Sequence, residues 1–186
     1  MAESRWSRVV VAGIITGAVM VAISNGGEDA PPAQAKVVPS RIDIPSLGIK
    51  APLMKLGVTD GEIELPPYEK PDVAGWVKDT AVPGDPGSAV ILGHVDTKTD
   101  PAVFYRLKEM RAGQAIKVVR SDGKVAQYRV DAIEQVAKDR FPADRVYLED
   151  GLRLITCGGK FDWDENEYDD NVIVYATLVE PADAGA

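Results

Sequence analysis

Short apolar runs separated by turn residues occupy most of the chain after about residue 37. Several of these runs are rich in Val and Ile, and others alternate apolar with polar positions, as strands with one buried face do. The predicted strands cover residues 41–45, 49–54, 62–65, 89–95, 115–119, 125–136, 152–157 and 171–179. Many short strands with little helix between them predict an all-β domain, a mostly antiparallel barrel or sandwich.

Turn and helix signals are few and local. Asp122-Gly123 lies between two alternating apolar runs, which predicts a β-hairpin whose two central residues have positive φ. A helical spacing of apolar residues runs from Ala102 to Met110, where Phe104 and Leu107 are three apart. A second short helical turn is predicted at residues 142–146. No internal repeat is visible in the sequence.

A different pattern precedes the strands, since residues 9–27 carry no charge. Nineteen helical residues span about 28 Å, close to the hydrocarbon thickness of a bilayer. Arg5 and Arg8 precede this run and Glu28 and Asp29 follow it, so the positive-inside rule places the rest of the chain outside the cytoplasm. The sequence therefore predicts a single-pass membrane anchor with an extracellular domain.

The remaining boundaries follow from this anchor. Residues 1–8 form its cytoplasmic n-region, residues 28–36 a Gly/Pro/Ala-rich linker, residues 37–180 the folded domain and residues 181–186 a tail. A cleaved signal peptide is the alternative, with Ala33-Gln34-Ala35 as a small-x-small cleavage site. Either interpretation exports the folded part of the chain.

Composition narrows the function class. With 186 residues, of which 45% are hydrophobic, the chain is expected to bury one core rather than two. The formal charge of −8, without a cluster of Lys and Arg, excludes nucleic acid as a partner, because phosphate binding requires such clusters.

The chain holds one cysteine, Cys157, and one histidine, His94. A single cysteine in an exported domain cannot form an intramolecular disulfide, so it is either a small buried hydrophobe or a reactive thiol. His94 ends a continuous apolar strand directly after Gly93, and Cys157 ends another directly before Gly158-Gly159. A thiol becomes a good nucleophile as thiolate, and an imidazole can take or return the proton.

At these residues the chain resembles a sortase, a family of cysteine transpeptidases that attach surface proteins to the Gram-positive cell wall. Leu154-Ile155-Thr156-Cys157 matches the cysteine signature of the family, and Gly93-His94 matches its strand-end histidine. The resemblance covers about Val37 to Val179. The longer segments at residues 93–96, 103–107 and 152–159 are similar to the actinobacterial class F branch.

The resemblance implies an eight-stranded β-barrel with one or two short helices. It also implies that Cys157 attacks the Thr–Gly bond of an LPXTG-type sorting signal on a surface protein and that His94 protonates the departing amine. An amine of a peptidoglycan precursor then releases the thioacyl-enzyme, and water does so more slowly. No cofactor is implied.

One position departs from the family pattern. Where the family usually carries an arginine on its closing strand, this chain has Asn171, which can donate a hydrogen bond to an oxyanion but carries no charge. Arg153 is the first substitute considered, because strand parity puts it on the face of Cys157, about 13 Å away along the strand. Arg106 is the second, and a surface role is the alternative for both.

Two neighbours of the pair complete the candidate site. Thr156 is a candidate substrate contact beside the nucleophile, although parity points it to the opposite face, where it would pack or bond to backbone. Asp96, two residues after His94, either orients the imidazole or caps the following turn.

Metal binding is not expected. The acidic segment 161–170 starts like a calcium-binding loop at Asp162, Asp164 and Asn166, but Glu167 replaces the required glycine and Ile173 the bidentate acid. This segment is interpreted as a solvated lid beside the cleft. One His and one Cys do not form a closed zinc site.

Other functions stay open at this point. A hydrolytic cysteine protease would use water in place of the amine, and a noncatalytic barrel would only bind peptide. An L,D-type transpeptidase is disfavoured, because the Ser-x-Gly-x-Cys run that it requires is absent before Cys157.

Overall fold

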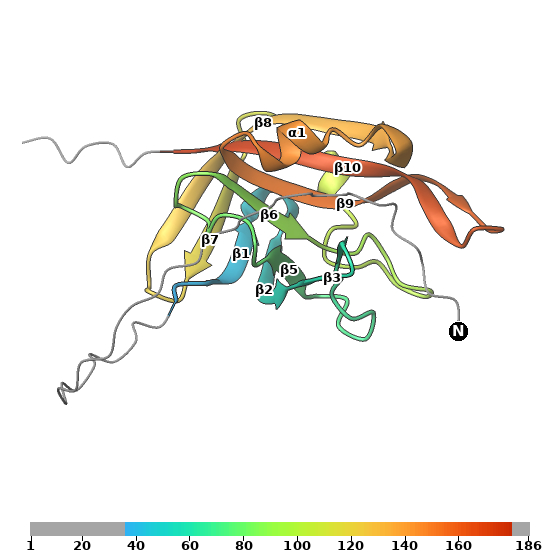
Figure 1. Cartoon of the computed structure of the whole chain (residues 1–186), viewed down its shortest axis with the longest axis horizontal. Helices are drawn as coiled ribbons and strands as arrows, with labels where there is room; N and C mark the ends of the chain where they lie inside the picture. Colours follow the sequence, from blue (N-terminus) through green and yellow to red (C-terminus); the bar gives the residue numbers. More distant parts are fainter. Residues whose placement is uncertain (1–35, 180–186) are drawn as a thin grey trace, which may run out of the picture.

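The computed structural model describes residues 36–179 as one closed eight-stranded β-barrel (Figure 1). In spatial order its strands are β1 (Pro39–Ile44), β2 (Ile49–Leu56), β5 (Ala74–Val77), β6 (Ser88–Leu92), β9 (Gly151–Asp162), β10 (Glu167–Leu178), β8 (Val125–Ala137) and β7 (Ala115–Arg120). A separate hairpin pairs β3 (Val58–Thr59) with β4 (Glu62–Ile63). The predicted all-β barrel is confirmed.

Helix is confined to short pieces. The helix α1 spans Ala143–Tyr147, close to the turn predicted at 142–146, and crosses the outside of the barrel near β8 and β10 (Figure 1). Single 3₁₀ turns cover Pro45–Leu47, Leu107–Glu109 and Lys138–Arg140. The helix predicted from Ala102 to Met110 is therefore reduced to a 3₁₀ turn at Leu107–Glu109. Phe104 and Leu107 are both buried, but an irregular backbone rather than one face of a helix brings their side chains into the core.

Two other expectations need correction. The strand β5 was not predicted, since AGWV is short and buried on both faces, so it shows no alternation. At the hairpin between β7 and β8, Gly123 has a φ of +82° but Asp122 does not have positive φ, because the connection is longer than two residues. The barrel also contains two parallel pairings, β2 with β5 and β6 with β9, among otherwise antiparallel ones.

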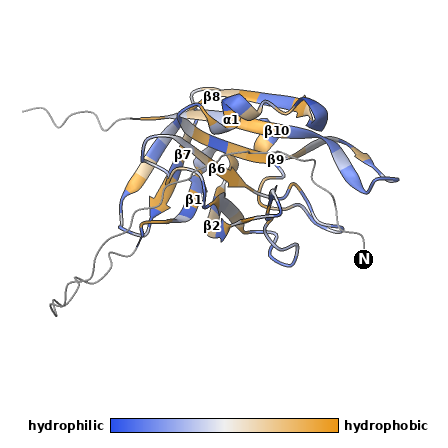
Figure 2. Cartoon of the chain, viewed as in Figure 1, coloured by the Kyte–Doolittle hydropathy of each residue, from blue (hydrophilic) through white to orange (hydrophobic). Residues whose placement is uncertain are grey.

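Hydrophobic residues are frequent along the barrel strands, as the orange segments of Figure 2 show, and their buried side chains form two clusters. The interior cluster fills the barrel and includes Phe104, Leu152, Leu154 and Val174. A second cluster covers the outer face of β6, β9 and β10, and its buried members are Leu56, Val77, Val90, Leu92, Val146, Ile155, Ile173 and Tyr175. Residues two apart on a strand point to the same face. A site residue therefore lies on the face of whichever cluster contains the residue two positions away from it.

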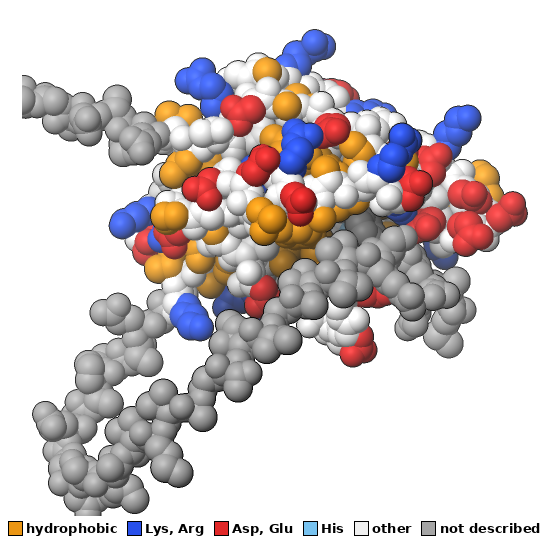
Figure 3. All heavy atoms as spheres, turned by 45° about the horizontal axis from the view of Figure 1, so that its top comes forward, with side chains coloured by type: hydrophobic (Ala, Val, Ile, Leu, Met, Phe, Trp, Pro, Cys, Tyr) orange, Lys and Arg blue, Asp and Glu red, His pale blue; other side chains and the backbone are white. Residues whose placement is uncertain are grey.

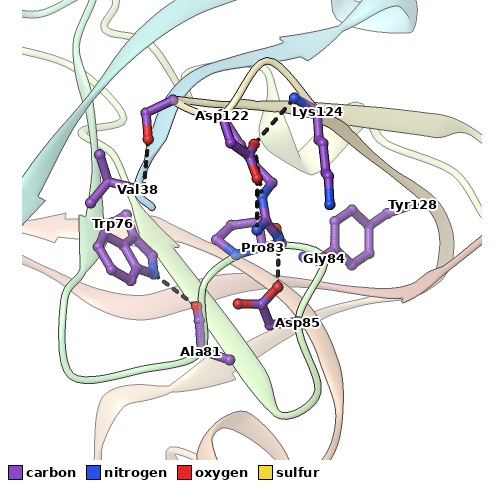
Figure 4. Close-up of polar contacts among 11 residues, drawn as sticks. Val38, Trp76, Ala81, Pro83, Gly84, Asp85, Asp122, Lys124 and Tyr128 are labelled. Carbon is purple, nitrogen blue, oxygen red and sulfur yellow. Dashed lines mark hydrogen bonds and ion pairs between the residues drawn. The ribbon is translucent and has the colours of Figure 1, made fainter. Parts of the chain in front are cut away.

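A polar network ties the loop after β5 to the β7–β8 hairpin at the end of the barrel where β9 begins (Figure 4). Trp76 donates its indole N–H to the carbonyl of Ala81 at 3.0 Å, and the Gly84 amide donates to the Tyr128 hydroxyl at 2.7 Å. Arg120 pairs with Asp85 at 2.6 Å and with Asp122 at 3.2 Å. This network closes the end of the barrel opposite to Cys157, which follows six residues after Gly151, the first residue of β9.

Within residues 36–179 no helix is both long and apolar enough to cross a bilayer. The predicted anchor at 9–27, the linker up to residue 35 and the tail at 181–186 lie outside the described residues. The domain boundaries stay predictions.

Candidate active site

Three residues of the candidate site come from neighbouring segments about midway along β9. The predicted strand ends need correction, because β9 continues past Cys157 to Asp162 and β6 ends at Leu92, two residues before His94. In the parallel pair Leu92 aligns with Ile155, and the Gly93 amide donates to the Ile155 carbonyl at 3.1 Å. Extended by two residues past the end of β6, this register predicts that His94 lies beside Cys157. On the other side, β10 aligns Asn171 with Cys157. Directly paired residues have Cβ atoms about 4.5–5.5 Å apart.

All three belong to the outer face of the barrel. Val90 and Leu92 lie four and two residues before His94, and both belong to the outer apolar cluster. Ile155 of the same cluster lies two residues before Cys157. Ile173 of the same cluster follows Asn171 by two residues. By strand parity His94, Cys157 and Asn171 therefore continue three adjacent outward rows, at the edge of an apolar surface. This row of a base, a thiol and an amide can perform acyl transfer through the thiol.

His94 is fixed by a segment that sequence reasoning did not single out. Its Nε2 lies 2.6 Å from the carbonyl oxygen of Pro66, and its ring stacks on Tyr68 with centroids 4.2 Å apart. A carbonyl only accepts, so Nε2 carries a proton and donates it to Pro66. Within residues 36–179 Nδ1 has no hydrogen-bond partner, which leaves it as the atom that can exchange a proton with the reaction.

The thiol of Cys157 sits in a low-polarity setting. Burial raises its pKa to about 11, with further raising by the charges of Glu167 and Asp96 and an opposing effect of Lys138. At pH 7 a thiol with such a pKa is ionised in about one molecule in ten thousand. The resting enzyme therefore holds a neutral thiol, and the substrate or His94 must help to generate the thiolate.

The groups around the thiol come from three separate parts of the chain. Lys138 pairs with Glu167 at 2.8 Å, and the Tyr168 hydroxyl donates to the Asp96 carboxylate at 2.5 Å. The charge of Cys157 contributes to raising the pKa of Tyr68 and of Tyr168, though burial is the largest cause for both. Asp96 was a candidate from the sequence, whereas Tyr68, Lys138 and Tyr168 belonged to no motif, and only the β9–β10 register could have pointed to Tyr168.

Asn171 is buried, with 3% of its surface exposed, and its Oδ1 has no hydrogen-bond partner among the described residues. Its side chain forms no hydrogen bond within residues 36–179, so the amide donors beside Cys157 are uncommitted. A buried amide without partners is costly unless a ligand completes it. Its place opposite the thiol fits a donor to a substrate carbonyl oxygen.

Arg153 shares the face of Cys157 but is not brought to it. Its guanidinium donates to the carbonyl oxygens of Arg145 at 3.0 Å and Glu149 at 3.1 Å, and it lies over the Tyr175 ring. These partners belong to α1 and to the turn that follows it, near the start of β9. The expectation that Arg153 reaches the oxyanion is corrected, because the guanidinium is buried and saturated where it is.

Three further candidates do not take the positions expected of them. The Arg106 guanidinium binds Glu109 at 2.6 Å and is half exposed. Thr156 turns its hydroxyl to the barrel interior, where it is buried without a partner among the described residues, so it does not face a substrate on the outer surface. Asp96 contacts Tyr168 rather than the His94 imidazole, so it does not orient the ring.

The acidic segment forms the tip of the β9–β10 hairpin, which projects from the barrel beyond the site (Figure 1) and carries several carboxylates (Figure 3). Asp162 accepts from the amides of Asp164 and Glu165, so it is used by its own turn. Trp163 is 85% exposed and packs on Phe161. Among residues 36–179 no group of three or more His, Cys, Asp and Glu side chains is placed to hold a metal ion.

Comparisons with known proteins agree with this geometry. The model of the Sortase domain family matches residues 42–179. A search of curated protein sequences returned no match.

Solved structures show the same fold. Sortase C1 of Streptococcus agalactiae superposes with a TM-score of 0.58 at 20% identity, covering 78% of this chain and 69% of that one. Sortase C-1 of Actinomyces oris gives 0.58 at 23% identity, covering 76% and 72%. The sortase D5 transpeptidase of Clostridium perfringens gives 0.55 at 20%, covering 77% and 79%. Because the family model spans nearly the whole described barrel, including His94 and Cys157, the chain belongs to the sortase family of cysteine transpeptidases.

Proposed function

We propose that this sortase acts at the cell surface, where it cleaves an LPXTG-type sorting signal between Thr and Gly and transfers the product to an amine of a peptidoglycan precursor. The alignment of His94, Cys157 and Asn171 on one outer face carries this proposal. The class F branch and the membrane anchor are part of the proposal and rest on the sequence.

The first half of the reaction uses the three residues in turn. The Cys157 thiolate attacks the Thr carbonyl carbon, and the oxygen gathers negative charge beside the Asn171 amide. His94, protonated on both nitrogens, gives the Nδ1 proton to the departing glycine nitrogen. The peptide bond breaks, and a thioester to Cys157 forms.

The second half regenerates the enzyme. An amine attacks the thioester carbonyl, neutral His94 takes a proton from the attacking nitrogen, and the Cys157 thiolate departs. Water can replace the amine and gives hydrolysis. Transfer is favoured over hydrolysis when the acceptor amine is bound close to the thioester, because attack within a bound complex is far more probable than a bimolecular encounter.

The test is to incubate the full-length chain with a peptide containing an LPXTG signal, with and without glycine peptides or peptidoglycan-stem amines. Mass spectrometry should find the released C-terminal fragment, a thioester on Cys157 and, with the amine, a new amide product. In Cys157→Ala all cleavage should stop while peptide binding persists.

Other outcomes separate the alternatives. Cleavage that never yields the amide product at any amine concentration would identify a hydrolytic protease. Peptide binding without cleavage by the unmodified chain would identify a noncatalytic barrel and overturn the proposal.

A further inference from the structure

Asp96 follows His94 by two residues and is held in place by Tyr168 of β10, the strand that pairs with Cys157. Its carboxylate accepts a 2.5 Å hydrogen bond from the Tyr168 hydroxyl, which joins the loop after β6 to the β9–β10 hairpin. Its backbone pairs with Pro101, and the turn between them is fixed by bonds from Thr97 to Asp100. The carboxylate is thus positioned by two different parts of the fold.

The charge of Asp96 is not balanced by a cation. Glu167, the other carboxylate that acts on Cys157, is paired with Lys138 at 2.8 Å. Among residues 36–179 no Lys or Arg forms an ion pair with Asp96. Tyr168 supplies a neutral hydroxyl, whose pKa is raised to about 12 by burial first and then by the bond to Asp96. The hydroxyl therefore stays protonated and donates its hydrogen bond to the Asp96 carboxylate.

An unbalanced carboxylate is a disadvantage for the first half of the reaction. A negative charge near a thiol disfavours the thiolate, and Asp96 does raise the pKa of Cys157. A site built only for cleavage would be better without this charge. Its placement calls for a step in which negative charge beside Cys157 helps.

The second half of the reaction is such a step. Once Cys157 is acylated its sulfur carries no charge, so the repulsion disappears. The acceptor is a primary amine, which at neutral pH arrives as an ammonium ion and cannot attack until it loses a proton. A carboxylate beside the thioester attracts the cation and can accept that proton.

We propose that Asp96, held by Tyr168, binds the acceptor amine as its ammonium ion beside the acylated Cys157 and takes its first proton. This inference rests on the proposed function. The ammonium gives a proton to Asp96, and the neutral nitrogen forms a bond to the thioester carbon. The nitrogen then gives a second proton to His94, and the carbon–sulfur bond breaks to release the Cys157 thiolate. Asp96 finally returns its proton to water, so atoms and charges balance.

The test compares full-length wild type with Asp96→Asn, which keeps the shape of the side chain and an acceptor for Tyr168. Two products are measured separately: the fragment released on acylation and the amide formed by transfer. The apparent KM for a glycine peptide should rise by about 10- to 100-fold, the range expected when a charge-assisted contact is lost. Fragment release without amine should be unchanged or faster.

A neutral acceptor makes the test specific. Hydroxylamine is uncharged at neutral pH, so its transfer should be unaffected in Asp96→Asn. The pH profile of Cys157 alkylation should move to lower pH in this variant, because a charge that raises the pKa of the thiol is gone. If the role of Asp96 were purely structural, Asp96→Asn would affect transfer to the glycine peptide and transfer to hydroxylamine equally.

Two further variants serve as controls. Asp164→Asn removes the same charge from the exposed hairpin tip and should change neither acceptor. Tyr168→Phe keeps the carboxylate but frees it, and should raise the KM for the glycine peptide severalfold with hydroxylamine unchanged. Should Asp96→Asn not fold, Tyr168→Phe carries the test alone.

The possible failures are distinguishable. An unmodified chain that releases no fragment contradicts the proposed function. If the chain cleaves and transfers but the variants lose both acceptors equally, or neither, the inference about Asp96 is overturned and the transpeptidase stands.

Discussion

Asn171 stands where sortases usually carry an arginine, and the structure places it directly across from Cys157. Its side chain is buried, carries no charge, and its Oδ1 has no hydrogen-bond partner among the described residues. The thiol it faces is largely neutral at rest, because burial raises its pKa to about 11. At the scale of single residues this site favours well-placed neutral donors over strong charges.

We expect Asn171→Asp to lower the rate of fragment release by about 100-fold, a typical loss for one oxyanion donor. The substitution keeps the shape but removes the N–H groups and adds a negative charge where the oxyanion forms. Initial rates at saturating peptide give the measurement.

The matched control is Asn166→Asp, the same chemical change at the exposed hairpin tip, where the φ of 55° is tolerated by either residue. Its rate should equal that of the unmodified enzyme. An Asn171→Asp enzyme that keeps its full rate would exclude the amide as the donor.

At the scale of elements, β9 contributes residues to two separate parts of the domain, the candidate site and the attachment of α1. Cys157 lies about midway along the strand, while Arg153 holds α1 and the turn after it through the carbonyls of Arg145, Glu149 and Asp150. Arg145 in turn pairs with Glu134 of β8 at 2.7 Å and lies over Tyr175. Arg153 therefore fastens α1 to the barrel.

We expect Arg153→Met to lower the free energy of unfolding by about 1–3 kcal/mol, since several hydrogen bonds of a buried charged group are lost. Fragment release per folded molecule should be unchanged. Denaturant unfolding and kinetics of the same preparations test this.

Arg106→Met is the control, and the loss of its exposed ion pair with Glu109 should leave the free energy of unfolding nearly unchanged. A large loss of activity in Arg153→Met at unchanged stability would return Arg153 to the site.

At the scale of the whole molecule, the closed barrel leaves no room for a side chain at two glycines. A Cβ on Gly75 of β5 would lie 2.4 Å from the fully buried Leu56 side chain, and one on Gly93 would lie 2.5 Å from that of Phe104. Neither neighbour can swing into solvent. The two glycines differ in that Gly93 directly precedes His94, whose carbonyl accepts from the Phe104 amide at 3.0 Å.

We expect Gly75→Ala and Gly93→Ala each to cost about 1–3 kcal/mol of stability through overpacking. Only Gly93→Ala should also reduce activity per folded molecule, because a displacement of the backbone at residue 93 would also move the adjacent His94. Thermal unfolding and rates measured where both variants are folded check the contrast. Equal specific activity in the two variants would contradict this coupling.

Much of the barrel was readable from local pattern. The alternation in 125–136 and the apolar runs at 89–95 and 152–157 reflect strands with one or two buried faces, and these strands are present. The strand β5 and the shortened helix near Leu107 were missed, because their residues are buried by partners distant in the chain. Local periodicity does not report such burial.

The sequence by itself determined the all-β class, the candidate thiol and imidazole, and the absence of an arginine at position 171, but not where the strands around Cys157 and His94 end. These depend on residue type and on strand period, which are local properties. Only the tertiary structure decided that β6, β9 and β10 are neighbours, that Arg153 is spent on the turn after α1, and that Pro66, Tyr68, Asp96 and Tyr168 surround the site. Those facts follow from strand order and register in the closed barrel, which bring together residues up to about a hundred positions apart.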